Sequence, residues 1–330
     1  MSLATDSSNN QAAITELMAG EMAQVDAVIH RRLASEVVLI NQISHYIVSA
    51  GGKRLRPMLV LLFSRALGFE QSARFELAAT VEFIHTATLL HDDVVDESSL
   101  RRGRQTANAL FGNAASVLVG DFLYSRAFQM MVSVDSMRVL EVLADATNVI
   151  AEGEVLQLLN MHDPDISVED YLRVIRYKTA KLFEASARIG AVLAGSDSPL
   201  EEACAAYGQA LGTAFQIVDD LLDYEGTTAA LGKNVGDDLR EGKPTLPLLA
   251  AMSRGTPEER ELIRHAIQNG EVERLDEIVA IVRRTGALDI TREAARAEAE
   301  RARAHISALP SSQFKDALLR LTVLAVDRTS

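Results

Sequence analysis

Two acidic motifs of the form DDxxD are the part of this sequence best suited to chemistry. The first, DDVVD, contains Asp92, Asp93 and Asp96, and the second, DDLLD, contains Asp219, Asp220 and Asp223. In a helix the first and last aspartates of each motif share a face. Paired carboxylates without His or Cys favour Mg²⁺, which binds one or two carboxylates together with substrate phosphates. A single motif could equally be a pair of solvated acids at a helix end, but two copies favour a metal-bound diphosphate.

Basic residues accompany both acidic motifs. They lie in GGKRLRP (Lys53, Arg54, Arg56), after the first motif (Arg101, Arg102), in mid-chain (Lys178, Lys181) and in the glycine-rich stretch GKNVGDDLREGKPT (Lys233, Lys243). Arginine can bind diphosphate oxygens with two hydrogen bonds, and lysine offers a point charge. A Lys–Arg cluster is more often a solvated surface. Beside two acidic motifs in an acidic chain, however, these residues favour an anionic substrate.

The overall composition narrows the classes of function. With 33 Lys and Arg against 46 Asp and Glu, the net charge of −13 disfavours nucleic acid as a partner and attachment to anionic lipid. No apolar run approaches the roughly 18 residues of a membrane span. The single cysteine, Cys204, excludes an intrachain disulfide and a cysteine-based metal site. We therefore expect a cytoplasmic protein with at most peripheral membrane contact.

The elements that must position these residues are predicted to be helices. Glycine and proline mark the breaks, and between them apolar residues recur at spacings of three and four, as in residues 75–96. Period-two alternation is missing, which argues against a sheet. The pattern predicts an all-α protein of about a dozen helices. We expect a disordered lead over residues 1–13 and a single domain over residues 14–330.

The motifs together resemble those of trans-polyprenyl diphosphate synthases, and most closely the bacterial octaprenyl type. The matching segments are GGKRLRP, HTATLLHDDVVDESSLRRG, GTAFQIVDDLLDY and LGKNVGDDLREGKPTLPL. The resemblance implies an isoprenoid synthase-type bundle around a central cavity, and a homodimer. It also implies repeated condensation of isopentenyl diphosphate with an allylic diphosphate in the trans configuration.

The resemblance further implies roles for residues at matching positions. Isopentenyl diphosphate would be bound by Lys53, Arg56, His85 and Arg102, and the allylic diphosphate by Arg101, Lys178, Lys233 and Lys243. Three Mg²⁺ ions would be held by Asp92, Asp96, Asp219, Asp220 and Asp223, with Asp93 alongside. Thr179 and Gln216 would turn oxygens toward the developing cation. Spacing independently places His85 on one helical face with Asp92 and Asp96, although a core histidine is the alternative for His85.

The expected chemistry follows from charge. Ionisation of the allylic C–O bond leaves a diphosphate and a carbocation, so metal and cationic side chains lower the barrier by stabilising the leaving group. Water must be excluded, and residues 226–244 form a candidate lid. The alkene of isopentenyl diphosphate then attacks, and the released diphosphate is the expected proton acceptor. We expect no catalytic nucleophile and no covalent enzyme intermediate.

Product length depends on the turns that precede the first acidic motif. Ala87 and Thr88 are small, whereas the resemblance implies that an aromatic residue there would give short products. Met131, ten residues or about 15 Å beyond Asp121, is the candidate floor, although ordinary core packing is its alternative role. We predict a C40 product, within a range of C35 to C50, used as a quinone side chain. Farnesyl diphosphate is the expected primer, with geranylgeranyl diphosphate as the alternative.

Three alternatives to this function remain. A shorter-chain synthase would stop at C15 to C20. A class I terpene cyclase would carry a second motif with Asn, Ser or Glu and an aromatic pocket, whereas this chain has DDLLD and no Trp. A non-catalytic partner subunit would lack one acidic motif, whereas this chain keeps both.

Overall fold

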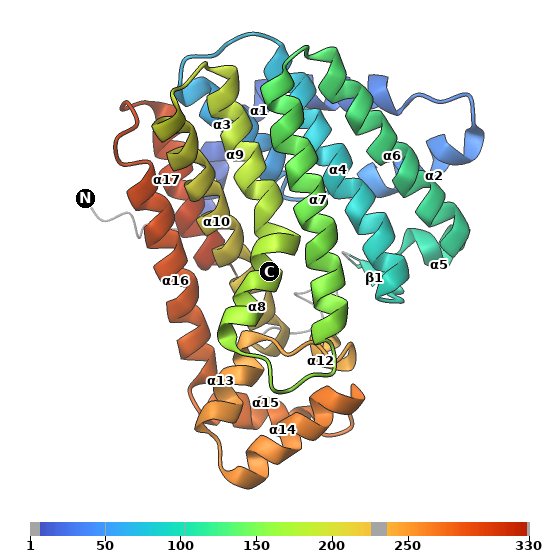
Figure 1. The fold of residues 1–330 in the computed structure, drawn as a ribbon, viewed down its shortest axis with the longest axis vertical. Helices are drawn as coiled ribbons and strands as arrows, with labels where there is room; N and C mark the ends of the chain where they lie inside the picture. Colours follow the sequence, from blue (N-terminus) through green and yellow to red (C-terminus); the bar gives the residue numbers. More distant parts are fainter. Residues whose placement is uncertain (1–6, 50, 102, 226–235, 329–330) are drawn as a thin grey trace. The chain divides into compact units, whose positions relative to one another are not determined.

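The computed structural model describes residues 7–49, 51–101, 103–225 and 236–328, and in these ranges the chain is almost entirely helical (Figure 1). The first half contains α1 (Ser7–Leu33), α2 (Val38–Ser49), α3 (Leu55–Ala66), α4 (Ala73–Val95), α5 (Ala107–Phe111), α6 (Asn113–Ser133) and α7 (Met137–Asn160). The second contains α8 (Val168–Ile175), the π-helix η1 (Arg176–Ala180), α9 (Lys181–Leu193), α10 (Ser198–Glu225), α12 (Asp237–Arg240), α13 (Leu246–Arg254), α14 (Pro257–Asn269), α15 (Leu275–Arg284), α16 (Ala287–His305) and α17 (Gln313–Val326). The prediction of an all-α protein is confirmed.

Helix α1 begins earlier than the sequence suggested. The predicted disordered lead covered residues 1–13, but residues 7–13 are helical. The polar start of α1 is held in place because Asn10 is buried and accepts a hydrogen bond from Arg320 Nη1 at 2.8 Å. Ile14 and Met18 then begin the buried stripe of this helix.

The contacts divide the chain into two compact units. Unit 1 comprises Met1–Thr147, Leu182–Gly208 and His305–Leu321, and unit 2 comprises Asn148–Lys181, Gln209–Ala304 and Thr322–Ser330. Every boundary between these ranges falls inside a helix, namely α7, α9, α10, α16 or α17. The predictions of a single domain and of a central cavity stay predictions.

Within unit 1, α4 and α6 lie side by side (Figure 1). His91 of α4 occupies the space beside Gly120 of α6, where a Cβ atom would come within 2.3 Å of the ring Nε2. Ser116 Oγ also donates a hydrogen bond to the carbonyl of Leu90 at 3.1 Å. These contacts fix the last turns of α4, which carry the first acidic motif, against α6.

A small hairpin follows α4, although no strand was predicted there. Strands β1 (Leu100–Arg101) and β2 (Arg104–Gln105) pair antiparallel, with Leu100 opposite Gln105. Strands of two residues are too short for a period-two pattern to be visible. Gly103 adopts a φ of 73°, which glycine tolerates without steric cost, and so permits the tight reversal.

Unit 2 has its own apolar core around the later turns of α10. Ile217 on α10, Leu248 on α13, Ile263 on α14 and Ile278 on α15 are all fully buried in it. Among the residues that the structure describes, no helix is long and apolar enough to cross a membrane.

Candidate active site

The first acidic motif closes α4. Asp92 and Asp96 are half-buried, and the backbone N–H of Asp96 donates to the carbonyl of Asp92 at 2.8 Å as the helix ends. Asp93 has no exposed surface, and its Oδ1 accepts a hydrogen bond from Arg101 Nε at 2.7 Å. Burial raises the pKa of the Asp93 carboxyl, and the Arg101 charge opposes that rise. Asp93 therefore anchors the hairpin to the end of α4, whereas Asp92 and Asp96 share the helical face that the sequence predicted.

These carboxylates suit a hydrated divalent ion better than a closed metal cage. Across the described ranges, no group of three or more His, Cys, Asp or Glu side chains is arranged to hold a metal. Mg²⁺ keeps several waters and takes only one or two carboxylates beside substrate phosphates. The Asp92–Asp96 pair fits that donor set.

Arg56 and His85, two predicted ligands of isopentenyl diphosphate, meet within unit 1. Arg56 Nη1 lies 3.2 Å from His85 Nε2, and the guanidinium lies 4.5 Å from the ring centre of Phe183. Lys53 is exposed in the segment that precedes α3, and Arg102 lies outside the described residues. The structure thus brings together two of the four predicted residues.

The second acidic motif lies on α10, in unit 2. Asp219 is the most exposed of the three aspartates, and its Oδ1 accepts a hydrogen bond from Arg328 Nη2 at 3.0 Å. Asp223 is buried, and its Oδ2 accepts a hydrogen bond from the backbone N–H of Asp238 at 3.3 Å. The three aspartates therefore have three different environments, although the sequence motif alone does not distinguish them.

Asp220 is only 4% exposed and accepts two side-chain hydrogen bonds. The Tyr171 hydroxyl donates to Oδ2 at 2.6 Å, and Gln216 Nε2 donates to Oδ1 at 2.8 Å. Burial, reinforced by the nearby Asp238 charge, raises the pKa of Asp220 well above its usual range, while the two hydrogen bonds oppose the rise. Burial, followed by the Asp220 charge, likewise raises the pKa of Tyr171 well above its usual range.

Lys178 and Thr179 lie on the π-helix η1, a rare conformation that occurs frequently at functional sites. Thr179 Oγ1 donates to Gln216 Oε1 at 3.0 Å, and Lys178 Nζ lies 2.6 Å from Glu154 Oε2 of α7. Helix α7 approaches η1 at Gly153, where a Cβ atom would come within 2.5 Å of the Lys178 backbone nitrogen. The close approach of α7 therefore requires glycine at this position.

The glycine-rich stretch is described only in its second half. Lys243 is half-buried and forms an ion pair with Glu241. Lys233 and most of the predicted lid lie outside the described residues, which resume at Gly236.

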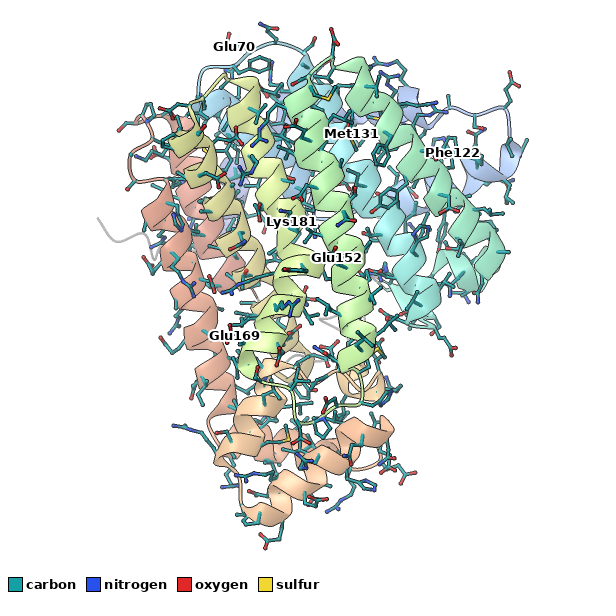
Figure 2. All side chains as sticks on the ribbon, viewed as in Figure 1. Glu70, Phe122, Met131, Glu152, Glu169 and Lys181 are labelled. Atoms are coloured by element: carbon teal, nitrogen blue, oxygen red, sulfur yellow. The ribbon has the colours of Figure 1, made fainter. Side chains whose placement is uncertain are left out.

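The predicted chain-length residues all belong to unit 1. Ala87 on α4 and Met131 on α6 are fully buried, and Thr88 is half-buried. Figure 2 shows Met131 on α6, well beyond Phe122 on the same helix.

Sequence reasoning missed three residues that contact the predicted site. Tyr171 and Glu154 are hydrogen-bonded or ion-paired to predicted residues, and Arg328 binds Asp219 from near the end of the chain. Tyr171 could have been found, because it precedes Lys178 by seven residues in a helical segment. Nothing local in the sequence marks Arg328.

Comparisons with known proteins identify the family to which the chain belongs. The polyprenyl synthetase family model matches residues 37–282. The chain is 57% identical to the octaprenyl diphosphate synthase of Escherichia coli (strain K12), over 97% of this chain and 99% of that one. It is 47% identical to the all-trans-nonaprenyl-diphosphate synthase (geranyl-diphosphate specific) of Rhodobacter capsulatus, over 94% and 96% of the two chains.

Solved structures agree as well. A polyprenyl synthase from Caulobacter crescentus CB15, complexed with calcium and isoprenyl diphosphate, matches with a TM-score of 0.94 and 46% identity over 97% of this chain and 98% of that one. The chain belongs to the polyprenyl synthetase family. It is a prenyltransferase of the long-chain trans-polyprenyl diphosphate synthase type.

Proposed function

We propose that this chain extends farnesyl diphosphate with successive isopentenyl diphosphates and releases the C40 product octaprenyl diphosphate. The observation that carries this proposal is the small, buried Ala87 one turn before Asp92 on α4, with Thr88 beside it. No aromatic side chain at these positions obstructs an apolar tail. The relative named octaprenyl diphosphate synthase supports C40, and the nonaprenyl relative supports a range of C35 to C50.

The acidic residues fit Mg²⁺ in this proposal. Asp92, Asp96, Asp219 and Asp223 would hold it, with three ions in the substrate complex, and the calcium complexed with the Caulobacter protein supports a divalent ion. When bound, Mg²⁺ supplies positive charge that stabilises the departing diphosphate. The predicted metal role of Asp220 is the least favoured by geometry, since both its oxygens already accept hydrogen bonds.

The cationic side chains bind the two diphosphates. Arg56 and His85, with Lys53 and Arg102, would hold isopentenyl diphosphate; Lys178 and Lys243, with Arg101 and Lys233, would hold the allylic diphosphate. As the allylic C–O bond breaks, the electron pair leaves with the diphosphate, and the cations stabilise the growing charge. The isopentenyl alkene attacks the carbocation, and the diphosphate accepts the proton that is lost. Thr179 and Gln216 direct oxygens toward the cation.

The product tail extends along α4, away from the acidic motif. Met131 is about 15 Å beyond Asp121 along α6 and acts as the floor. We further propose a homodimer, which the exposed apolar side chains Leu118 and Val132 of α6 support. We place the enzyme in the cytoplasm, where its product supplies a quinone side chain.

The first experiment measures the product. Purified protein is incubated with farnesyl diphosphate, labelled isopentenyl diphosphate and Mg²⁺, and the dephosphorylated products are sized by mass spectrometry. A product centred on C40 is expected. A stop at C15 to C20 would overturn the proposed length, and no condensation product at all would favour a cyclase or a partner subunit.

Two single substitutions, one in the motif and one as a control, test the role of the first acidic motif. Asp92→Ala removes one carboxylate of the half-buried pair, and turnover is expected to fall by about 10³-fold. Asp289→Ala is the matched control, because Asp289 is an exposed aspartate that pairs with its neighbour Arg292 on α16. Unchanged turnover in Asp92→Ala would contradict the mechanism.

A further inference from the structure

Four side chains of unit 2 form a continuous hydrogen-bonded chain that ends on one carboxylate. The Thr179 hydroxyl donates to Gln216 Oε1 at 3.0 Å, and Gln216 Nε2 donates to Asp220 Oδ1 at 2.8 Å. From the other side, the Tyr171 hydroxyl donates to Asp220 Oδ2 at 2.6 Å. Two donors therefore meet on Asp220, which is almost completely buried, and Thr179 is linked to it through the Gln216 amide.

Asp220 sets the orientation of the Gln216 amide. If the amide were turned by half a rotation, its carbonyl oxygen would face a carboxylate oxygen, and two acceptors would meet. The NH₂ group would then face the Thr179 hydroxyl, and the hydroxyl proton would lose its acceptor. One orientation satisfies both neighbours and the other satisfies neither, so the amide is fixed as long as Asp220 is fixed.

Tyr171 is the group that fixes Asp220 from the opposite side. It lies on α8, which continues directly into the π-helix that carries Thr179. Helix α8 starts at a reciprocal cap between Ser167 and Asp170, which sets the register of Tyr171 on that helix. The ring of Tyr171 is buried, so its hydroxyl has little freedom to exchange Asp220 for water.

We propose that Tyr171 is a positioning residue for the condensation. Through Asp220 it fixes the Gln216 amide, and the fixed amide oxygen then holds the proton of the Thr179 hydroxyl in a hydrogen bond. The lone pairs of Thr179 Oγ1 are then directed away from Gln216. A chain of hydrogen bonds that ends on a carboxylate also polarises each oxygen along it. This inference rests on the proposed function, in which the Thr179 oxygen faces the allylic cation.

The first test is Tyr171→Phe, which removes the hydroxyl and keeps the buried ring. We expect the single-turnover rate of carbon–carbon bond formation to fall about tenfold, with the KM for both substrates changed less than about twofold. Tyr207→Phe is the matched control: Tyr207 is also buried, and its hydroxyl donates at 2.6 Å to the carbonyl of Leu318, outside the site. This control is expected to retain the wild-type rate.

Two binding measurements separate positioning from other roles of Tyr171. Calorimetry with a farnesyl thiolodiphosphate, in which sulfur replaces the bridging oxygen and ionisation is slow, should give an affinity within about twofold of wild type. The Mg²⁺ concentration that gives half-maximal thermal stabilisation with this ligand should also be unchanged. A marked shift of either value with an unchanged bond-forming rate would overturn the proposal in favour of metal or diphosphate binding.

A double-mutant cycle tests whether Tyr171 acts through Thr179. Thr179→Val removes the hydroxyl at the far end of the chain and keeps the branched shape. Tyr171→Phe should lower the rate about tenfold in the wild type but less than about twofold in the Thr179→Val background. Equal tenfold losses in both backgrounds would overturn the proposal, and so would a wild-type rate in Tyr171→Phe alone. A wild-type protein without any condensation activity would instead refute the proposed function.

Discussion

Arg56 is held by a ring face as well as by a polar partner. Its guanidinium lies over Phe183, and one nitrogen lies beside His85. A planar guanidinium can stack on an aromatic ring and still present a donor pair to a phosphate, whereas an ammonium group cannot do both. We therefore expect the planar shape of the group, as well as its charge, to matter at this position.

This argument predicts the effect of Arg56→Lys. The KM for isopentenyl diphosphate should rise about tenfold, the loss of one good charge-assisted contact, while the KM for the allylic primer stays within about twofold. Steady-state kinetics with each substrate varied in turn measures both values. Arg65→Lys is the control, because Arg65 likewise lies over a ring, that of Phe314, and has no predicted substrate role. Equal KM changes for both substrates would contradict the assignment.

Ala87 gives a second prediction at the residue scale. A phenylalanine there would fill the space along α4 that the growing tail needs, so Ala87→Phe should shift the product from C40 toward C15 to C20. Mass spectrometry of the products measures the shift, and the thermal midpoint of the variant shows whether the larger side chain is accommodated. A folded variant that still makes C40 would place the tail elsewhere.

The residues with proposed chemical roles were easier to predict from the sequence than the residues that hold them in place. Asp92 and Asp96 share a helical face because of their spacing alone, and Arg56 and His85 meet as the motif resemblance implied. The separate environments of Asp219, Asp220 and Asp223 depend on partners as distant in sequence as Tyr171 and Arg328. No pattern within the motif carries that information.

The meeting of α7 with η1 is a tightly constrained contact at the element scale. Gly153 leaves no room for a side chain, because the facing atoms are backbone atoms of Tyr177 and Lys178 and the Cβ of Tyr177. None of these atoms can move aside as the far end of a flexible side chain can. The spacing between these helices therefore determines where Lys178 and Thr179 lie.

We predict that Gly153→Ala lowers both stability and turnover. Forcing a methyl group into this contact should cost about 1–3 kcal/mol of unfolding free energy and displace η1. Gly20→Ala is the control, since no atom lies within 4 Å of the added methyl and alanine favours the helix by about 0.5–1 kcal/mol. Denaturant melts and turnover rates measure both variants. A fully active and stable Gly153→Ala protein would show that α7 can move away without consequence.

The all-helical character of the chain could be predicted, and the short elements that depart from it have a common cause. The spacing of apolar residues indicated a helix over residues 75–96, and α4 spans Ala73–Val95. The hairpin after α4 and the π-helix η1 were not predicted, because short strands carry no period and a π-turn depends on tertiary contacts. Both elements contain predicted site residues, and functional sites are where the local secondary-structure preference of a sequence is least decisive.

At the scale of the whole molecule, the two units share helices. Helix α10 contributes its first part to unit 1 and its second part, with the acidic motif, to unit 2. Cys204, the only cysteine, lies in the first part and is completely buried. Burial raises the pKa of its thiol to about 12.

Cys204 should therefore report on unfolding. At pH 8 the buried thiol stays protonated and inaccessible, so iodoacetamide should label the native protein at least about 100-fold more slowly than the unfolded chain. Because the folded pKa is raised, the stability that the neutral thiol contributes is complete below pH about 8.5 and is lost as the pH rises toward 12.

Mass spectrometry at increasing denaturant measures the labelling. Ser311→Cys, which adds an exposed thiol in the loop before α17, is the control and should label rapidly under native conditions. Rapid labelling of Cys204 in the native wild type would contradict the burial of this part of α10.

The π-helix also bears on how such a site can change over generations. A π-turn holds about one residue more than an α-turn, so residues 176–180 contain a local surplus of one residue. Deleting one residue there would turn the segment into ordinary α-helix and leave the helices on either side in nearly the same register, because the π-turn only absorbs the surplus residue. Thr179 lies inside that turn, so a single codon loss would move its hydroxyl relative to Gln216 without altering either side chain. Mutations that change the length of this segment can therefore disrupt the site, as can mutations that replace its side chains.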